Sequence, residues 1–176
     1  MEHKILAILF DSGDTIVDEG TEIKDETGAT LEAKLIPGAA DAVRALKERG
    51  YRLALVADGP AATFYNTLGP RGLLELFDAL AISGLVGVEK PDARMFRCAL
   101  DQLDILPEQY GRVVMIGNNL SRDVKGANEL GIVSIWLDWA PRRPKIPADA
   151  SEQPCFTIKM PAELPRVIEQ LEASLP

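Results

Sequence analysis

Short uninterrupted runs of apolar residues recur along the chain, separated by more polar segments. These runs cover residues 4–10, 52–57, 77–83, 113–116 and 132–137. A continuous apolar run of this length is typical of a strand buried on both faces, as in a parallel sheet. The pattern therefore predicts five buried strands.

Helical patterns lie between these runs. Residues 37–50 have Pro37 near their start and Gly50 at their end, and similar patterns follow at residues 61–76 (broken near residue 69), 92–103 and 121–130. Strands that alternate with helices in this way imply right-handed βαβ crossovers. We therefore predict an α/β fold with a doubly wound parallel sheet in a three-layer α/β/α arrangement.

Two segments do not follow the alternation. Residues 18–36 are polar, and their residues 25–28 have the chemistry of a hairpin turn, so this segment is predicted to be a small β-hairpin flap. Beyond a loop at 141–147, residues 156–160 are expected to form an edge strand and residues 163–174 a closing helix. We expect residues 1–176 to be a single domain, with residues 141–176 as an extension packed on the core.

Composition narrows the class of protein. The chain has 176 residues, of which 47% are hydrophobic, which is enough for a sizeable core. Its formal charge is −8 and its basic residues are scattered, so nucleic acid and membrane are not expected as general partners. We expect a reduced, cytoplasmic setting, because the two cysteines are far apart in sequence and the sequence has neither a long apolar stretch nor a signal-peptide pattern.

Polar residues cluster where the predicted strands end. Ligands of an open parallel sheet bind beyond the carboxyl ends of its strands. Clustered carboxylates favour a hard cation such as Mg²⁺, and a nearby lysine favours an anion such as phosphate. The residues that follow the runs and predict such a site are Asp11, Asp14, Asp58, Lys90, Asn118, Asn119 and Asp123.

These residues, with Thr15, resemble the motifs of the haloacid dehalogenase-like (HAD) hydrolase superfamily over roughly residues 4–140. Most members are Mg²⁺-dependent phosphatases that form an aspartyl-phosphate. The resemblance implies that Asp11 is the nucleophile and that Lys90 stabilises charge. It also implies metal binding by Asp11, Gly13, Asn118 and Asp123, and substrate binding by Thr15, Ala57, Asp58 and Lys90.

Three positions depart from the family motifs. The second aspartate of the first motif, which serves as general acid, is replaced by Gly13. Since general acid–base catalysis contributes about 10²–10⁴ in rate, we expect a phosphatase with this sequence to have low activity or a substitute acid. Ala57 replaces a phosphate-binding hydroxyl, and Asn118 replaces a charged metal ligand, so weaker Mg²⁺ binding is expected.

The identity of a substitute acid stays open in the sequence. Asp14 lies one residue beyond Gly13 and either reaches the leaving group or points into the protein. The first outcome favours a phosphatase and the second a non-catalytic protein. Asp58 is expected to cap the following helix. Arg142, Arg143 and Lys145 are expected to form a solvated run, and the alternative is that they reach the substrate phosphate over the open rim.

Substrate access also stays open. Residues 18–36 and 59–83 are too short for a separate cap domain, so we expect a capless protein with an open site. Such a site suits a small or macromolecular phosphorylated substrate, or closure by a second copy of the chain. The leading hypothesis is a Mg²⁺-dependent hydrolase of phosphate monoesters. The alternatives are a phosphate- and metal-binding or regulatory protein without catalysis, and different covalent chemistry at a carbon or phosphonate centre.

Overall fold

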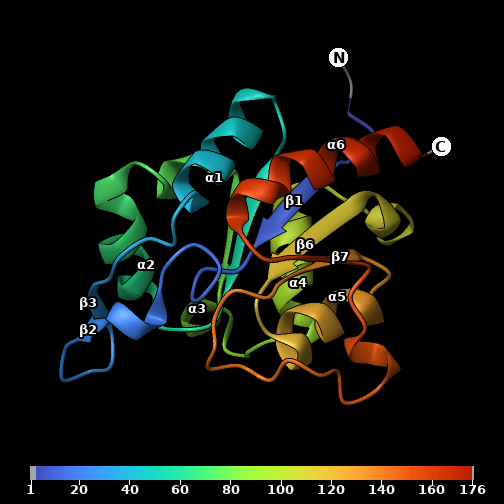
Figure 1. Cartoon of the computed structure of the whole chain (residues 1–176). Helices are drawn as coiled ribbons and strands as arrows, with labels where there is room; N and C mark the ends of the chain where they lie inside the picture. The colour runs from blue at the N-terminus through green and yellow to red at the C-terminus, as the bar shows by residue number, and fades with distance from the viewer. Residues whose placement is uncertain (1–2, 176) are drawn as a thin grey trace.

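A six-stranded parallel sheet forms the centre of the computed structural model, which describes residues 3–175 (Figure 1). The strand order is β5-β4-β1-β6-β7-β8, so the first strand lies inside the sheet. Along the chain, β4 and β5 are added on one side of β1, and the chain then crosses to the other side of β1 to form β6. The strands are β1 (Ala7–Phe10), β4 (Leu53–Ala57), β5 (Ala79–Ile82), β6 (Val113–Gly117), β7 (Val133–Leu137) and β8 (Phe156–Ile158).

Helices connect the strands as the alternating pattern predicts. All five predicted strands are present, and the doubly wound α/β fold is confirmed. The predicted break of the helix 61–76 near residue 69 is confirmed: α2 ends at Leu68, and Gly69 and Pro70 open a 3₁₀ turn. The predicted helix 121–130 begins instead with a π-helical turn at Leu120–Val124. The helices are α1 (Ala39–Glu48), α2 (Ala61–Leu68), α3 (Ser83–Val86), α4 (Ala93–Gln102), α5 (Lys125–Glu129) and α6 (Leu164–Ser174).

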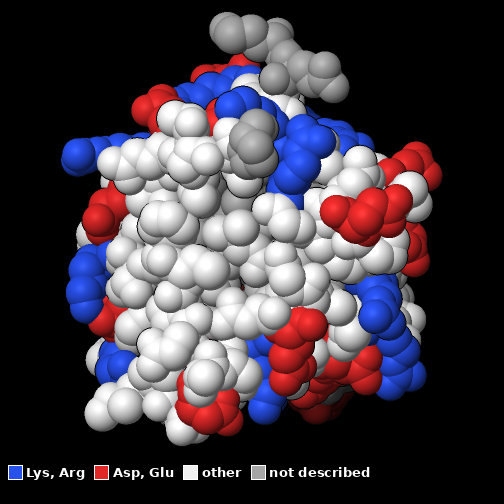
Figure 2. Space-filling model, turned by 90° about the vertical axis from the view of Figure 1, so that its right-hand side faces the viewer, with Lys and Arg blue, Asp and Glu red and all other residues white. Residues whose placement is uncertain are grey.

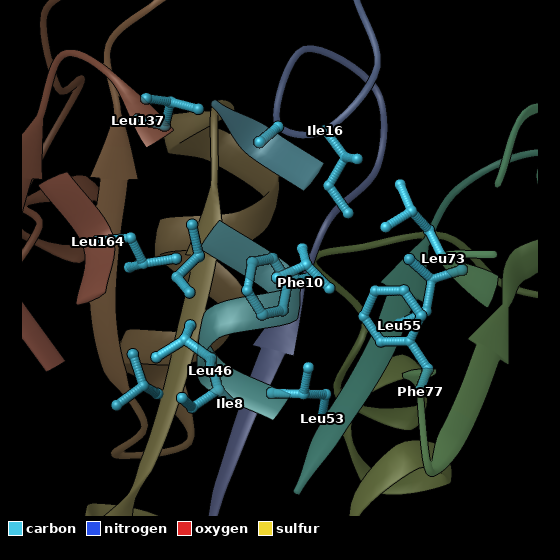
Figure 3. Close-up of a cluster of buried hydrophobic side chains, with 14 of the residues drawn as sticks. Ile8, Phe10, Ile16, Leu46, Leu53, Leu55, Leu73, Phe77, Leu137 and Leu164 are labelled. Atoms are coloured by element: carbon cyan, nitrogen blue, oxygen red, sulfur yellow. The ribbon is translucent and has the colours of Figure 1, made fainter. Parts of the chain in front are cut away.

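The strands β1, β4, β5 and β6 contribute alternate side chains to two separate hydrophobic clusters. In β1, Ile8 and Phe10 face the cluster shared with α1, α2 and α6, part of which Figure 3 shows. Ala7 and Leu9 face the opposite cluster, which includes the buried residues of α4. Because successive residues of a strand point to opposite faces, one apolar run supplies both cores. The result is helices on both faces of the sheet.

Packing on the α4 face is close enough to require small residues. Phe96 of α4 is fully buried, and Gly126 of α5 lies against its ring. A Cβ at position 126 would lie 2.4 Å from Phe96 Cε2 and 3.3 Å from the backbone of Pro91. This contact fixes the distance between α5 and the loop that carries Lys90.

The predicted flap is a two-stranded antiparallel hairpin of β2 (Ile23–Lys24) and β3 (Thr30–Glu32). The Asp25 side chain accepts hydrogen bonds from backbone and hydroxyl groups of the turn, including Thr27. The β3 strand lies against α2, where the Thr30 backbone N–H donates to Thr63 Oγ1. The hairpin is therefore attached to the helix that follows β4.

The last part of the chain adds to the sheet and to one helical layer. The predicted edge strand is β8, which pairs in parallel with β7, and the predicted closing helix is α6, which packs near α1. That residues 1–176 form one domain stays a prediction. No helix within residues 3–175 is long and apolar enough to cross a membrane. Charged side chains of both signs surround the mostly uncharged centre of the face in Figure 2, without a basic stripe.

Candidate active site

Lys90 connects two of the predicted site carboxylates. Its Nζ donates to Asp11 Oδ1 at 2.8 Å and to Asp123 Oδ1 at 2.7 Å. The third hydrogen bond goes to the backbone carbonyl of Val56, at 2.7 Å. All three donors of the ammonium are therefore used, and the lysine side chain is only 2% exposed.

Each of these groups lies at the carboxyl end of a strand. Asp11 directly follows β1, and its backbone N–H donates to the Ile116 carbonyl of β6. Lys90 lies in the loop before α4, and its backbone N–H donates to Asp58 Oδ1 just beyond β4. The parallel sheet thus brings together side chains that are up to 112 residues apart in sequence, as the apolar runs predicted.

Asp123 approaches the sheet because of the turn that carries it. The π-helical turn at Leu120–Val124 aims the carboxylate back toward β6, where Oδ2 accepts from the Asn119 backbone N–H at 3.0 Å. A Cβ at position 117 would lie 2.2 Å from the Asp123 carboxyl carbon. Glycine at the end of β6 is therefore required for this approach.

A polar cavity of about 70 Å³ opens beside these residues. Carboxylates and cationic side chains supply most of its wall. Thr15 and Ala57 lie just outside this lining, although Thr15 Oγ1 donates to Asp11 Oδ2 at 3.3 Å. The lining residues are Asp11, Gly13, Glu19, Asp58, Lys90, Asn118, Asn119, Arg122, Asp123 and Arg143.

Negative charge exceeds positive charge in this cavity, since four carboxylates face three cationic side chains. Burial, and next to it the charge of Asp11, raise the pKa of Asp123 to about 7, although Lys90 opposes the shift. For Lys90, burial alone lowers the pKa, but Asp11 and Asp123 outweigh it, so the net shift is upward. The ammonium is charged, and one more cation would stabilise the site.

The donor set fits Mg²⁺. Within residues 3–175 no three acidic, histidine or cysteine side chains form a ready-made metal cluster. Mg²⁺ does not need one, because it is usually held by one or two carboxylates together with water and substrate phosphate. Asp11 and Asp123 are two buried carboxylates on one cavity, and Asn118 and the Gly13 backbone carbonyl add neutral oxygen donors.

The Asp14 side chain does not point into the cavity. Its side chain is fully buried, outside the cavity lining, and its backbone has φ +52°. Oδ1 accepts from Arg142 Nη1 and from the Glu19 backbone N–H. Asp14 therefore holds the loop after β1 in place, which is the outcome that by itself favours a non-catalytic protein.

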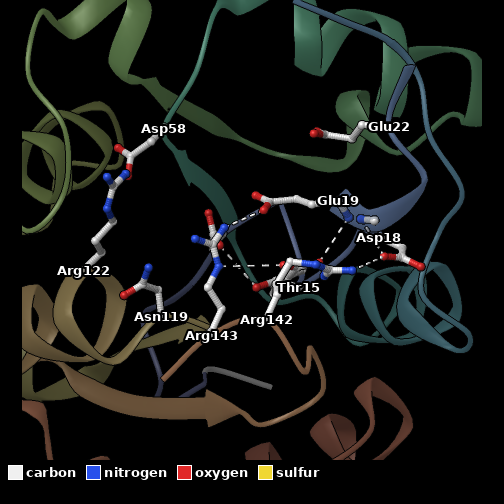
Figure 4. A network of polar contacts seen from close by, with 12 residues as sticks. Thr15, Asp18, Glu19, Glu22, Asp58, Asn119, Arg122, Arg142 and Arg143 are labelled. Atoms are coloured by element: carbon white, nitrogen blue, oxygen red, sulfur yellow. Dashed lines mark hydrogen bonds and ion pairs between the residues drawn. The ribbon is translucent and has the colours of Figure 1, made fainter. Parts of the chain in front are cut away.

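Glu19 and Arg143 are cavity residues that the sequence did not single out for the site. The Glu19 carboxylate lies over Gly13, with Oε2 paired to Arg143 Nη2 at 2.5 Å (Figure 4). Burial raises the pKa of Glu19; Arg143 lowers it, whereas Asp14 and Asp11 raise it. The predicted solvated run is therefore wrong for Arg142 and Arg143, because ion pairs with Asp14, Asp18 and Glu19 hold both side chains against the loop after β1.

The cap predicted for Asp58 is also wrong. Pro60 precedes the first turn of α2, and Gly59 adopts φ +146°, which turns the chain away from Asp58. The Asp58 carboxylate instead pairs with Arg122 at 3.1 Å and accepts the Lys90 backbone N–H (Figure 4). Asp58 thus joins the loops after β4 and β6 at the cavity.

Comparison with known proteins identifies the family of the chain. The model of the haloacid dehalogenase-like hydrolase family matches residues 2–131. Glyceraldehyde 3-phosphate phosphatase of Methanopyrus kandleri is 32% identical over 72% of this chain and 53% of its own. Phosphoserine phosphatase of Thermus thermophilus is 36% identical over 59% of this chain and 41% of its own.

A solved structure has a similar fold. The magnesium-bound HAD-hydrolase YfnB of Bacillus subtilis has a TM-score of 0.65 and 26% identity, covering 77% of this chain and 56% of its own. The chain thus spans about half the length of the curated relatives it matches.

Proposed function

Because the chain belongs to the haloacid dehalogenase-like hydrolase family, we propose that it is a Mg²⁺-dependent phosphatase acting on phosphate monoesters. The observation that carries the proposal is the Lys90 ammonium hydrogen-bonded to both Asp11 and Asp123 at the edge of a polar cavity. A structural ion pair alone would not leave the Asp11 carboxylate at an opening. The phosphatases among the relatives and the magnesium in the YfnB structure support the same function.

In the proposed reaction Asp11 attacks the phosphorus atom, the bond from phosphorus to the ester oxygen breaks, and an aspartyl-phosphate forms as the alcohol leaves. Lys90 holds the Asp11 carboxylate by one oxygen, so the other is available for attack once Thr15 releases its long 3.3 Å contact. The same ammonium stabilises the negative charge that develops on the phosphoryl group. Water then hydrolyses the aspartyl-phosphate and releases phosphate.

Asp11 and Asp123, together with Asn118 and the Gly13 carbonyl, would hold the metal. A bound Mg²⁺ would neutralise phosphate charge and reduce repulsion between the ester and the carboxylates. Asp58 orders the Lys90 loop, and Arg122 lies beside it as a cation for the phosphate or the rest of the substrate. Ala57 offers only its backbone, so substrate binding at the end of β4 depends on main-chain groups.

The test is hydrolysis of a panel of phosphate esters with and without Mg²⁺. The unchanged protein is compared with Asp11→Asn and with Asp41→Asn, an exposed aspartate of α1. We expect metal-dependent turnover that Asp11→Asn abolishes and Asp41→Asn leaves unchanged. Binding of Mg²⁺ and inorganic phosphate without any turnover would instead support the non-catalytic alternative.

A further inference from the structure

Glu19 lies where a side chain at position 13 would be. A Cβ built on Gly13 would be 2.0 Å from Glu19 Oε1, 2.8 Å from its Cδ and 3.0 Å from its Cγ. The carboxylate thus points at Gly13 with Oε1 foremost, within the reach of an aspartate side chain at that position. A side chain at position 13 would have to displace the Glu19 carboxylate, because Glu19 fills the space beside Gly13.

The surrounding contacts fix this carboxylate in the cavity beside Asp11. The Glu19 backbone N–H donates to Asp14 Oδ1 at 3.1 Å, which sets the position of the residue. Arg143 binds Oε2, so the Oε1 atom is the one turned to Gly13 (Figure 4). Glu19 and Asp11 both line the cavity, so an ester attacked by Asp11 would lie in the same cavity as the Glu19 carboxylate.

We propose that Glu19 is the general acid–base residue of this active site and takes the part that an aspartate at position 13 would take. The proposal rests on the proposed phosphatase function. As Asp11 attacks phosphorus, the bond to the ester oxygen breaks, and that oxygen keeps the electron pair and takes the proton of the Glu19 carboxyl group. In the second step the Glu19 carboxylate takes a proton from water, whose oxygen bonds to phosphorus, and Asp11 leaves.

The choice of leaving group separates this role from a structural one. The kcat/KM value reports formation of the aspartyl-phosphate, in which an alkoxide needs protonation and a p-nitrophenolate does not. We expect Glu19→Gln, which keeps the shape and an acceptor for Arg143, to lower kcat/KM by ~10²–10⁴ for an alkyl phosphate. For p-nitrophenyl phosphate we expect a change of less than about tenfold.

Two further variants complete the experiment. Glu108→Gln changes an exposed glutamate outside the cavity lining and should leave both kcat/KM values unchanged. Gly13→Asp combined with Glu19→Ala places the carboxyl group on residue 13 in the space that Glu19 leaves, and should restore most of the alkyl phosphate activity. Thermal unfolding of each variant shows whether it is folded.

If folded Glu19→Gln loses kcat/KM equally on both esters, or on neither, Glu19 is not the general acid–base residue. Turnover that still depends on Asp11 would in that case uphold the phosphatase function. If the unchanged protein hydrolyses neither ester, the proposed function itself fails, and the role of Glu19 with it. A selective loss on the alkyl ester that the double variant reverses is the expected result.

Discussion

Replacing Lys90 by methionine tests whether this lysine compensates the buried carboxylates. The substitution keeps an unbranched apolar side chain but removes the ammonium from between Asp11 and Asp123, which are 12% and 1% exposed. Removing one partner of a buried ion pair typically costs about 3–5 kcal/mol, because the remaining charge has no partner. We expect a loss of that size in the free energy of unfolding at pH 8 without Mg²⁺.

The pH dependence of this loss has a definite sign. Without Lys90, the folded-state pKa of Asp123 rises further above the unfolded value of about 3.9. The folded variant then binds a proton that the unfolded chain releases, so its stability falls as pH increases through this window. We therefore expect a smaller loss at pH 5 than at pH 8, and partial recovery at pH 8 when Mg²⁺ is added.

Urea unfolding, followed by the fluorescence of buried Trp136, measures both effects. Lys47→Met is the matched control, because Lys47 also pairs with an aspartate, Asp78, but with both side chains about one-third exposed. Such surface pairs contribute about 0–1 kcal/mol. If Lys90→Met costs no more than Lys47→Met, Lys90 does not compensate the site charges.

Three further predictions concern other parts of the structure. Gly126→Ala should cost about 1–3 kcal/mol in urea unfolding by overpacking Phe96, and Phe96→Leu in the same chain should recover part of it. Arg142→Met should leave the buried Asp14 carboxylate without its strongest partner and lower stability by about 1–3 kcal/mol, unless Asp14→Asn accompanies it. Burial raises the pKa of Tyr51 to about 12, so folded tyrosine keeps a proton that the unfolded chain loses near pH 10. The free energy of unfolding should therefore fall as the pH rises from about 10 to about 12, and Tyr51→Phe should remove this pH dependence. An unchanged pH dependence in Tyr51→Phe would contradict the raised pKa of Tyr51.

The sequence predicted the parts of the fold and site that follow from local pattern. The apolar runs located the buried strands, and the rule for the carboxyl ends of parallel strands then brought Asp11, Lys90 and Asp123 together. These residues could be predicted because each directly follows or lies near a strand end. The hairpin likewise followed from turn chemistry at residues 25–28.

Glu19 and Arg143 could not be predicted because their positions depend on long-range contacts. The pair is 124 residues apart in sequence and meets only when the loop after β7 folds back over the loop after β1. A local hint existed in the carboxylates at positions 18 and 19, eight residues or fewer beyond Asp11. Their direction, however, depends on Asp14 in its left-handed conformation and on the arginines that bind it.

The most direct test of the proposed mechanism is to look for the phosphorylated intermediate. The unchanged protein is mixed with Mg²⁺ and a phosphate ester, quenched in acid during turnover, digested and analysed by peptide mass spectrometry. We expect one phosphoryl group on Asp11, absent from Asp11→Asn. With p-nitrophenyl phosphate as the ester, we expect it to be more abundant in Glu19→Gln, because only the hydrolysis step then needs Glu19. Metal-dependent turnover with a phosphoryl group on another residue, or with none on any peptide, would contradict the assignment of Asp11 as nucleophile.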